Sequence, residues 1–130
     1  MTPADLFVYG TLRSGCDNPF ARLLSRSAAP RGAGKVQGRL FLIENYPGAV
    51  PSSVESQWVF GEVWTLRTPE TTLSVLDDYE GCGPRSPLPH EFRRAEALAY
   101  LPEPVLVWIY WYNFDPRGKR IIPGGRFAGC

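Results

Sequence analysis

The sequence predicts an α+β protein, a small mixed β-barrel of about five strands or more with two or more flanking helices. Three observations predict it: five segments rich in β-branched, apolar and aromatic residues, two segments that begin with a cap residue followed by proline, and many turn residues. The chain has 13 Gly, 13 Pro and 13% aromatic residues among its 130 residues. This composition is typical of short strands joined by tight turns. One core suffices at this length, so we expect a single domain over residues 1–130.

The first predicted strand is Leu6–Tyr9, and Gly10 ends it. Asn18-Pro19 then supplies a helix N-cap followed by proline at the first helical position. These two residues predict a short helix that continues to about Arg26.

Two further strands are expected in the middle of the chain. Lys35–Glu44 predicts one strand, which ends at a turn signal over residues 45–48. Trp58–Leu66 predicts the next. Gly61 lies inside it and suggests a β-bulge or a close approach of another backbone.

A second helix is expected from Glu70 to about Tyr79. Thr68-Pro69 repeats the cap-plus-proline pattern before it, and Gly81 follows its end. Proline cannot disturb the helical hydrogen bonds at the first position, because the amide there has no partner within the helix.

The last third of the chain predicts two more strands. In Glu91–Leu101, residue propensities favour a helix, but the alanines alternate at period two, and we predict a strand. Val105–Tyr112 is β-branched and aromatic throughout, as in a buried central strand. From about residue 115 the chain is rich in glycine and proline, and we expect an irregular tail.

The charge balance excludes some classes of partner. The chain has 14 Lys+Arg against 13 Asp+Glu, a formal net charge of +1. Nucleic acids and anionic membranes call for a clustered basic face, so we expect neither partner. No apolar run approaches the ~18 residues of a membrane-spanning helix. The N-terminal residues also lack the pattern of a signal peptide, so we expect a cytoplasmic protein.

The cysteines and the histidine limit the possible chemistry. Cys16, Cys82 and Cys130 are widely spaced and odd in number, which predicts three free thiols in a reducing compartment and no zinc site. His90 is the only histidine and lies in a proline-rich loop, where we expect it to be exposed to solvent. A catalytic Ser-His or Cys-His pair would have to use it.

Residues Tyr9–Arg13 form the first candidate site. A strand here runs into a glycine turn, and amide N–H groups after such a turn can converge on a carboxylate or a developing oxyanion. Thr11 can add its hydroxyl group. The same motif is typical of an ordinary tight turn that needs a positive φ at Gly10. Taken alone, the motif does not distinguish an anion-binding loop from such a turn.

Glu80 is the second candidate. At about 100° per residue, it lies on the same helix face as Leu73 and Leu76, whereas Asp78 points away. An inward carboxyl group is desolvated, which raises its pKa toward the range of a general acid/base. The alternatives are a frayed last turn or an ion pair with an arginine. Asp77 is too close to Glu80 for the two to flank a sugar bond as a glycosidase pair.

Six segments of the chain, taken in order, resemble the γ-glutamylcyclotransferase-like superfamily, in its AIG2-like branch. The resemblance covers most of the chain from residue 6 to about residue 114. Its motifs are Phe7-Val8-Tyr9-Gly10-Thr11-Leu12-Arg13, Gly38-Arg39-Leu40-Phe41, Tyr46-Pro47-Gly48, Gly61-Glu62-Val63-Trp64, Leu76-Asp77-Asp78-Tyr79-Glu80-Gly81 and Val107-Trp108-Ile109-Tyr110.

The resemblance implies a small mixed β-barrel with flanking helices and a specific reaction. A γ-glutamyl amide cyclises to 5-oxoproline and releases its amine, without a metal or an organic cofactor. Glu80 matches the family's catalytic glutamate, which takes a proton from the substrate's ammonium group and later gives one to the leaving amine. The backbone of Tyr9, Gly10, Thr11 and Leu12 matches the loop that binds the γ-glutamyl group.

Two expectations concern substrate contacts near this site. Tyr110 matches a strand tyrosine of the family, and it is either a substrate contact or a core tyrosine with a satisfied hydroxyl. The segment Cys82–Glu91 is longer and richer in proline than in the family, so we expect substrate choice to differ here. The partner expected is a small γ-glutamyl substrate, and the sequence does not indicate an oligomeric state. The alternative function is a non-catalytic module of the same fold that binds a small ligand or a partner.

Overall fold

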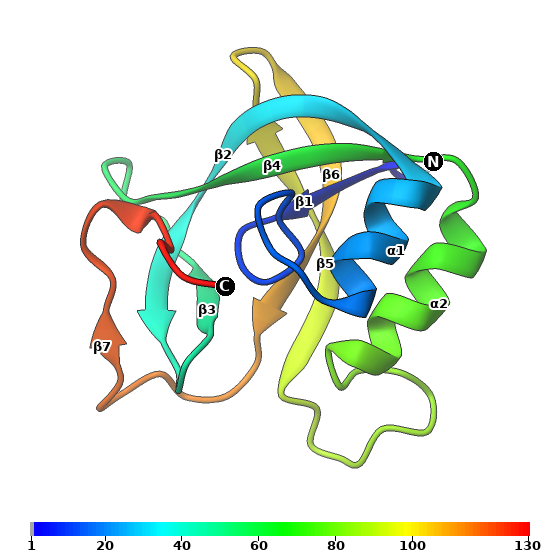
Figure 1. Ribbon diagram of the computed structural model, residues 1–130. Helices are drawn as coiled ribbons and strands as arrows, with labels where there is room; N and C mark the ends of the chain where they lie inside the picture. Colours follow the sequence, from blue (N-terminus) through cyan, green and yellow to red (C-terminus); the bar gives the residue numbers. More distant parts are fainter. Residues whose placement is uncertain (1) are drawn as a thin grey trace.

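The computed structural model describes residues 2–130, and its elements follow the order expected from the sequence (Figure 1). The strands and helices are β1 (Asp5–Val8), α1 (Pro19–Ser27), β2 (Ala28–Leu42), β3 (Pro47–Pro51), β4 (Trp58–Leu66), α2 (Pro69–Tyr79), β5 (Phe92–Tyr100), β6 (Pro104–Tyr112) and β7 (Arg120–Ile121), followed by a short 3-10 helix over Pro123–Gly125.

Five of the strands close into a barrel. They follow the order β2-β4-β1-β6-β5, and β5 pairs again with β2 to complete the circle. The β1–β6 pair is parallel and the other pairs are antiparallel, so the barrel is mixed. This confirms the α+β class and the small mixed barrel with two flanking helices. Strands β3 and β7 were not predicted. Each of them pairs with β2 and lies outside the closed circle of five strands.

Strand β1 is buried on both faces, which explains the apolar run Leu6-Phe7-Val8 that follows Asp5. Phe7 and Tyr9 belong to the core inside the barrel, whereas Leu6 and Val8 pack in the core under the two helices. All four residues of β1, Asp5 included, are buried, as expected where a strand has packed layers on both sides. The loop that follows β1 is therefore anchored to a strand that is buried on both faces.

The two helices lie side by side along one flank of the barrel (Figure 1). Asn18 caps α1, because its Oδ1 accepts hydrogen bonds from the amides of Phe20 at 3.1 Å and Ala21 at 2.9 Å. Helix α2 begins at Pro69, one residue before the expected start at Glu70, and ends before Gly81, whose φ of +76° suits glycine. The expected side-chain cap at Thr68 is absent, since its hydroxyl makes no cap hydrogen bond.

The expectation of three free thiols is wrong. Cys16, in the loop before α1, and Cys130, at the end of the tail, form a disulfide across 114 residues of sequence. Among residues 2–130 only Cys82 is a free cysteine. Spacing patterns identify paired cysteines only when the pairing is local, and this pair is brought together by the fold. The thiols therefore give no basis for a reducing compartment.

No helix within residues 2–130 is both long and apolar enough to cross a membrane.

Candidate active site

A cavity of about 380 Å³ lies where β1, the end of α2, the start of β5 and strand β6 meet. All six residues predicted for the site line this cavity, together with residues that sequence reasoning did not single out. The predicted residues are Tyr9, Gly10, Thr11, Leu12, Glu80 and Tyr110.

Three residues of the loop after β1 line the cavity and have amide N–H groups without a partner in the described part of the protein. Within residues 2–130, the N–H groups of Gly10, Thr11 and Leu12 have no hydrogen-bond acceptor, although Leu12 is buried. Unpaired buried amides are rare in proteins, and an anionic group of a ligand would satisfy them. The loop therefore has the form of an anion-binding turn.

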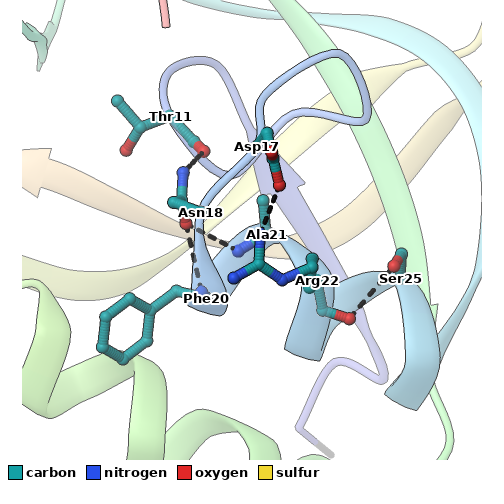
Figure 2. A network of polar contacts seen from close by, with 7 residues as sticks. All are labelled: Thr11, Asp17, Asn18, Phe20, Ala21, Arg22 and Ser25. Atoms are coloured by element: carbon teal, nitrogen blue, oxygen red, sulfur yellow. Dashed lines mark hydrogen bonds and ion pairs between the residues drawn. The ribbon is translucent and has the colours of Figure 1, made fainter.

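The carbonyl groups of the same loop are held by the protein. The amide of Arg13 donates to the Gly10 carbonyl at 3.2 Å, and the Arg13 Nε donates to it at 2.9 Å. The side-chain amide of Asn18 donates to the Thr11 carbonyl at 2.8 Å, as Figure 2 shows. These contacts fix the loop so that its amides, rather than its carbonyls, remain available.

Gly10 is required by a close approach rather than by a positive φ. It is not among the glycines with φ in the left-handed region, so the tight-turn interpretation with a positive φ at Gly10 is wrong. A Cβ at this position would lie 2.9 Å from Cγ of Pro47 and 3.2 Å from its Cδ. Glycine thus lets the loop pack against Pro47 at the start of β3, which also lines the cavity.

Thr11 is tied to the end of α2. Its hydroxyl oxygen lies 2.7 Å from that of Tyr79, and the ring of Tyr79 stacks on Phe20 of α1 with centroids 4.2 Å apart. The Thr11 hydroxyl therefore already has one protein partner and joins the loop to both helices.

Glu80 occupies the C-cap of α2, and its carboxyl group makes no hydrogen bond or ion pair with any residue of the described chain. The residue is half-buried, and its unpartnered carboxyl oxygens are not fully buried. Burial raises the pKa of Glu80 to about 8, and the nearby Glu91 and Asp77 carboxylates add to the rise. A carboxyl group with such a pKa can both accept and donate a proton near neutral pH.

Asp77 lies one helical turn away and has a different environment. Arg94 Nε donates to its Oδ1 at 2.8 Å and Nη2 to its Oδ2 at 3.1 Å, and the Tyr110 hydroxyl donates to Oδ1 at 2.7 Å. The guanidinium group of Arg94 also lies 4.3 Å from the ring centroid of Trp108. The arginine ion pair expected as an alternative for Glu80 is therefore formed by Asp77 instead.

The two tyrosines of the predicted site have hydroxyl groups bound within the protein. The Tyr9 hydroxyl donates to the carbonyl of Tyr110 at 2.5 Å and accepts from the amide of Ala49 at 3.1 Å. Tyr110 binds Asp77 as described above. Burial raises the pKa of both hydroxyl groups far above its usual range, so both are neutral. They join β1, β3, β6 and α2 around the cavity.

Glu91 and Tyr46 are the principal residues that sequence reasoning missed. Both are half-buried in the cavity wall, and the Tyr46 hydroxyl donates a hydrogen bond to the Glu91 carboxylate. Desolvation and this contact raise the pKa of Tyr46 above its usual range. The sequence does place Glu91 between a proline-rich loop and a strand. Whether its side chain faces the cavity depends on how β5 pairs with β6, which the sequence does not show.

The cavity residues do not fit a metal ion. No group of three or more His, Cys, Asp or Glu side chains within residues 2–130 is placed to hold one. His90, which is half-buried, does not line the cavity. The groups available for chemistry are therefore a carboxyl group with a raised pKa and a set of free amides.

Three solved structures illustrate what the fold is similar to. YkqA from Bacillus subtilis aligns with a TM-score of 0.72 at 23% identity over 95% of this chain, which spans only 39% of YkqA. A mouse AIG2-like protein aligns with a TM-score of 0.64 at 24% identity, covering 98% of this chain and 100% of that one. A structure described as a gamma-glutamyl cyclotransferase aligns with a TM-score of 0.65 at 17% identity, covering 90% and 68% of the two chains.

At these identities the structures establish the fold alone, and no curated protein matches the sequence significantly. The sequence profile of a protein family is more informative. The profile described as "Gamma-glutamyl cyclotransferase, AIG2-like" matches residues 6–129, which include the amide loop, Glu80 and Tyr110. The chain therefore belongs to the AIG2-like gamma-glutamyl cyclotransferase family.

Proposed function

We propose that this protein converts a γ-glutamyl amine or γ-glutamyl peptide into 5-oxoproline and a free amine. One observation carries the proposal: an unpaired carboxyl group with a raised pKa, that of Glu80, shares a cavity with the unpaired amides of Gly10, Thr11 and Leu12. The carboxyl group suits proton transfer, and the amides suit the binding of an anionic oxygen of the substrate.

In the proposed reaction, the nucleophile belongs to the substrate. The α-amino nitrogen attacks the γ-carbonyl carbon, a C–N bond forms, and the bond to the leaving amine breaks. The attack is intramolecular, so the protein's main task is to hold a folded conformation of the γ-glutamyl group. The loop amides bind its anionic oxygens, either the α-carboxylate or the oxyanion of the tetrahedral intermediate.

Glu80 moves the protons that this reaction requires. The α-ammonium group begins with three protons, and the ring nitrogen of 5-oxoproline keeps one. The other two leave with the amine as an ammonium ion, which balances atoms and charge. Ionised Glu80 accepts a proton from the α-ammonium group and, once protonated, donates it to the leaving nitrogen. All steps are additions, eliminations and proton transfers.

The test is the release of 5-oxoproline and amine from a panel of γ-glutamyl amides. Glu80→Gln keeps the shape of the side chain but cannot carry a proton, so kcat/KM should fall by about 10²- to 10⁴-fold. Glu70→Gln is the matched control, because Glu70 is exposed in the first turn of the same helix and lies outside the cavity. Equal turnover by wild type and Glu80→Gln would overturn the role of Glu80.

The alternative function, a non-catalytic binding module, predicts thermal stabilisation by γ-glutamyl compounds without product. Of the long segment after Glu80, only Glu91 lines the cavity, so the segment does not fill it. The absence of an ion pair on Glu80 within the described chain also favours the enzyme. Stabilisation without release of 5-oxoproline at any pH would favour the module instead.

A further inference from the structure

A second, open groove lies on the barrel, separate from the cavity at the end of α2. Its volume is about 910 Å³, and none of the described residues lines both hollows. Ligand sites typically have volumes of ~300–1,000 Å³. The groove lies where the start of β4, the turn between β5 and β6 and the tail around Arg126 meet. The proposed cyclisation leaves this groove without a role.

The aromatic residues of the groove point out of the barrel. Lys35 of β2 pairs with Phe60 of β4 and with Tyr100 of β5, and directly paired residues of neighbouring strands share one face of a sheet. Trp58 lies two residues before Phe60 and so shares that face, whereas Val59 between them is fully buried in the core inside the barrel. All three aromatic side chains are only half-buried. They therefore line an open surface.

Two cations lie on these rings. The Lys35 ammonium nitrogen is 4.3 Å from the ring centroid of Trp58, and Cζ of Arg126 is 4.0 Å from that of Phe60. The tail that carries Arg126 packs directly on β4, since a Cβ at Gly125 would lie 1.9 Å from the Trp58 carbonyl oxygen. These contacts hold both positive charges at defined positions.

The two charges have no anionic partner in the described chain. Neither cation forms an ion pair or donates a side-chain hydrogen bond within residues 2–130, and no Asp or Glu of these residues lines the groove. Glu62, the next outward-facing residue of β4, is bound elsewhere: the amide of Ser14 donates to it at 2.8 Å and the Ser14 hydroxyl at 2.7 Å. The N–H donors of both cations are therefore free for an anionic ligand.

The ring faces indicate which kind of anion fits. A nucleobase would need an open aromatic face for stacking, but the two cations already lie on the rings of Trp58 and Phe60. A cation held on a ring presents its remaining donors to carboxylate oxygens. Leu101, which packs against the core inside the barrel, adds an apolar wall for hydrocarbon groups. The groove therefore favours aliphatic carboxylates over planar aromatic anions.

The spacing of the two cations matches that of an extended peptide. Trp58 and Phe60 are alternate residues of one strand, so their side chains repeat at about 7 Å, and each carries one cation. Alternate side chains of any extended chain repeat at the same distance, whereas adjacent ones point to opposite sides. Two acidic residues separated by one residue can therefore meet both cations.

We propose that this groove is a docking site for an extended acidic segment of a partner protein, in which two acidic residues are separated by one residue. Their carboxylates bind Lys35 and Arg126, and their hydrocarbon parts lie along the aromatic side chains and Leu101. The site is independent of the proposed function, because its residues do not line the cavity that holds Glu80.

Binding of three labelled seven-residue peptides, measured by fluorescence anisotropy, tests the proposal. The first has two glutamates separated by one alanine, the second has the two glutamates adjacent, and the third has glutamines in place of the glutamates. All other residues are alanine and serine. The wild type should bind the first peptide about 3- to 10-fold more tightly than the second and about 10- to 100-fold more tightly than the third, because each charge contact contributes separately.

Charge-removing variants locate the binding. Lys35→Gln and Arg126→Gln should each weaken binding of the first peptide by about 3- to 10-fold, whereas Lys35→Arg should keep most of it. Arg126 is exposed in the tail, so its variant tests the groove even if Lys35→Gln lowers the Tm. Arg120→Gln is the matched control: it removes an exposed arginine of β7 that does not line the groove, and it should bind like wild type.

Four results would overturn the docking site. They are no binding of any peptide up to about 1 mM, equal affinity for the first two peptides, an equal loss of affinity in Arg120→Gln, and displacement of the peptide by a lower concentration of a mononucleotide or an oligouridylate. Release of 5-oxoproline by Lys35→Gln and Arg126→Gln should equal that of wild type. Peptide binding with no 5-oxoproline from any of these proteins would overturn the proposed function and support the docking site.

Discussion

The side chain of Asn18 joins the amide loop to helix α1. Its Nδ2 donates to the Thr11 carbonyl at 2.8 Å, while its Oδ1 caps the helix by accepting from two amides (Figure 2). One residue therefore sets the start of the helix and the conformation of the loop that faces the cavity. The two roles use different atoms, so they can be separated by substitution.

We predict that Asn18→Ser reduces activity more than stability. Serine retains an oxygen for the cap but lacks the donor to Thr11, so KM should rise several-fold while the Tm stays close to that of wild type. Asn18→Ala should show the same loss of activity and also a loss of about 1 kcal/mol in the free energy of unfolding. Thermal melts and steady-state kinetics of both variants check this, and equal KM values for wild type and Asn18→Ser would contradict it.

The raised pKa of Glu80 predicts that the protein is less stable at alkaline pH than its Glu80→Gln variant. In the unfolded chain the carboxyl group loses its proton around its ordinary pKa of 4.5, but in the folded protein it keeps the proton until about pH 8. The folded state therefore binds more protons between these values, and stability falls as the pH rises through that window. The glutamine variant lacks this loss, so it should be more stable above pH 8 by up to a few kcal/mol.

Melting curves of the two proteins from pH 4 to pH 9 provide the measurement. The Tm difference should be near zero at the acidic end, where both side chains are neutral, and should favour Glu80→Gln at the alkaline end. A difference that is constant over the whole range would show that the carboxyl group titrates with an ordinary pKa.

Activity should have the opposite dependence on pH, because the proposed base is the ionised form of Glu80. We expect kcat/KM to increase with pH around a midpoint near 8, and to decrease again where the free substrate loses its ammonium proton. Glu91 and Asp77 are the charged groups that raise the pKa of Glu80. Glu91→Gln should therefore move the acidic limb to lower pH, whereas the exposed Asp78→Asn should leave it in place.

The disulfide between Cys16 and Cys130 predicts a stability that depends on the redox state. It closes a loop of 114 residues, and removal of such a cross-link typically costs about 2–5 kcal/mol. Cys130→Ser should lower the Tm by on the order of 10 °C, and dithiothreitol should lower the Tm of the wild type but not that of the variant. Cys82→Ser, which removes the free thiol, is the control that should keep the response to reductant.

Most of the barrel could be predicted from local patterns, but two strands could not. The third predicted strand, Trp58–Leu66, has the bounds of β4, and Gly61 within it does meet another backbone, since a Cβ there would lie 2.2 Å from the Val8 carbonyl oxygen. The turn predicted over residues 45–48 overlaps the start of strand β3, and no strand is predicted there. Within residues 2–130 strand β3 pairs only with β2, and an edge strand tolerates the proline at each of its ends. Strand β7 has two residues, which are too few to show the alternating pattern of a strand.

The candidate site was predictable where a residue's direction follows from its own helix or turn. Glu80 faces inward because of its spacing from Leu73 and Leu76, and the amides of the loop are free because they follow a strand end. Glu91, Tyr46 and the disulfide depend on how distant segments meet, which spacing along the chain does not encode. The ion pair of Asp77 also depends on tertiary structure, because its partner Arg94 lies on a strand whose register is set by β6.

The contact between Gly10 and Pro47 predicts that an alanine at position 10 impairs the cavity more than the fold. The new Cβ would lie 2.9 Å from Cγ of Pro47, and a proline ring cannot move aside as a flexible side chain would, so the loop must shift away from the facing wall. The φ of Gly10 is not in the left-handed region, so the backbone itself does not forbid alanine. We therefore expect kcat/KM to fall by at least about 10-fold, because proximity and orientation depend on small displacements.

Gly15→Ala is the matched control for this substitution. Gly15 lies in the same loop, an added Cβ would meet nothing within 4 Å, and its φ is not in the left-handed region. Alanine there should leave kinetics unchanged and raise the free energy of unfolding by about 0.4–1 kcal/mol, because it restricts the unfolded chain. If Gly10→Ala and Gly15→Ala have the same kcat/KM, the position of the amide loop against Pro47 does not govern activity. If only Gly10→Ala loses activity while it still unfolds cooperatively near the wild-type Tm, the loss comes from the displaced amides.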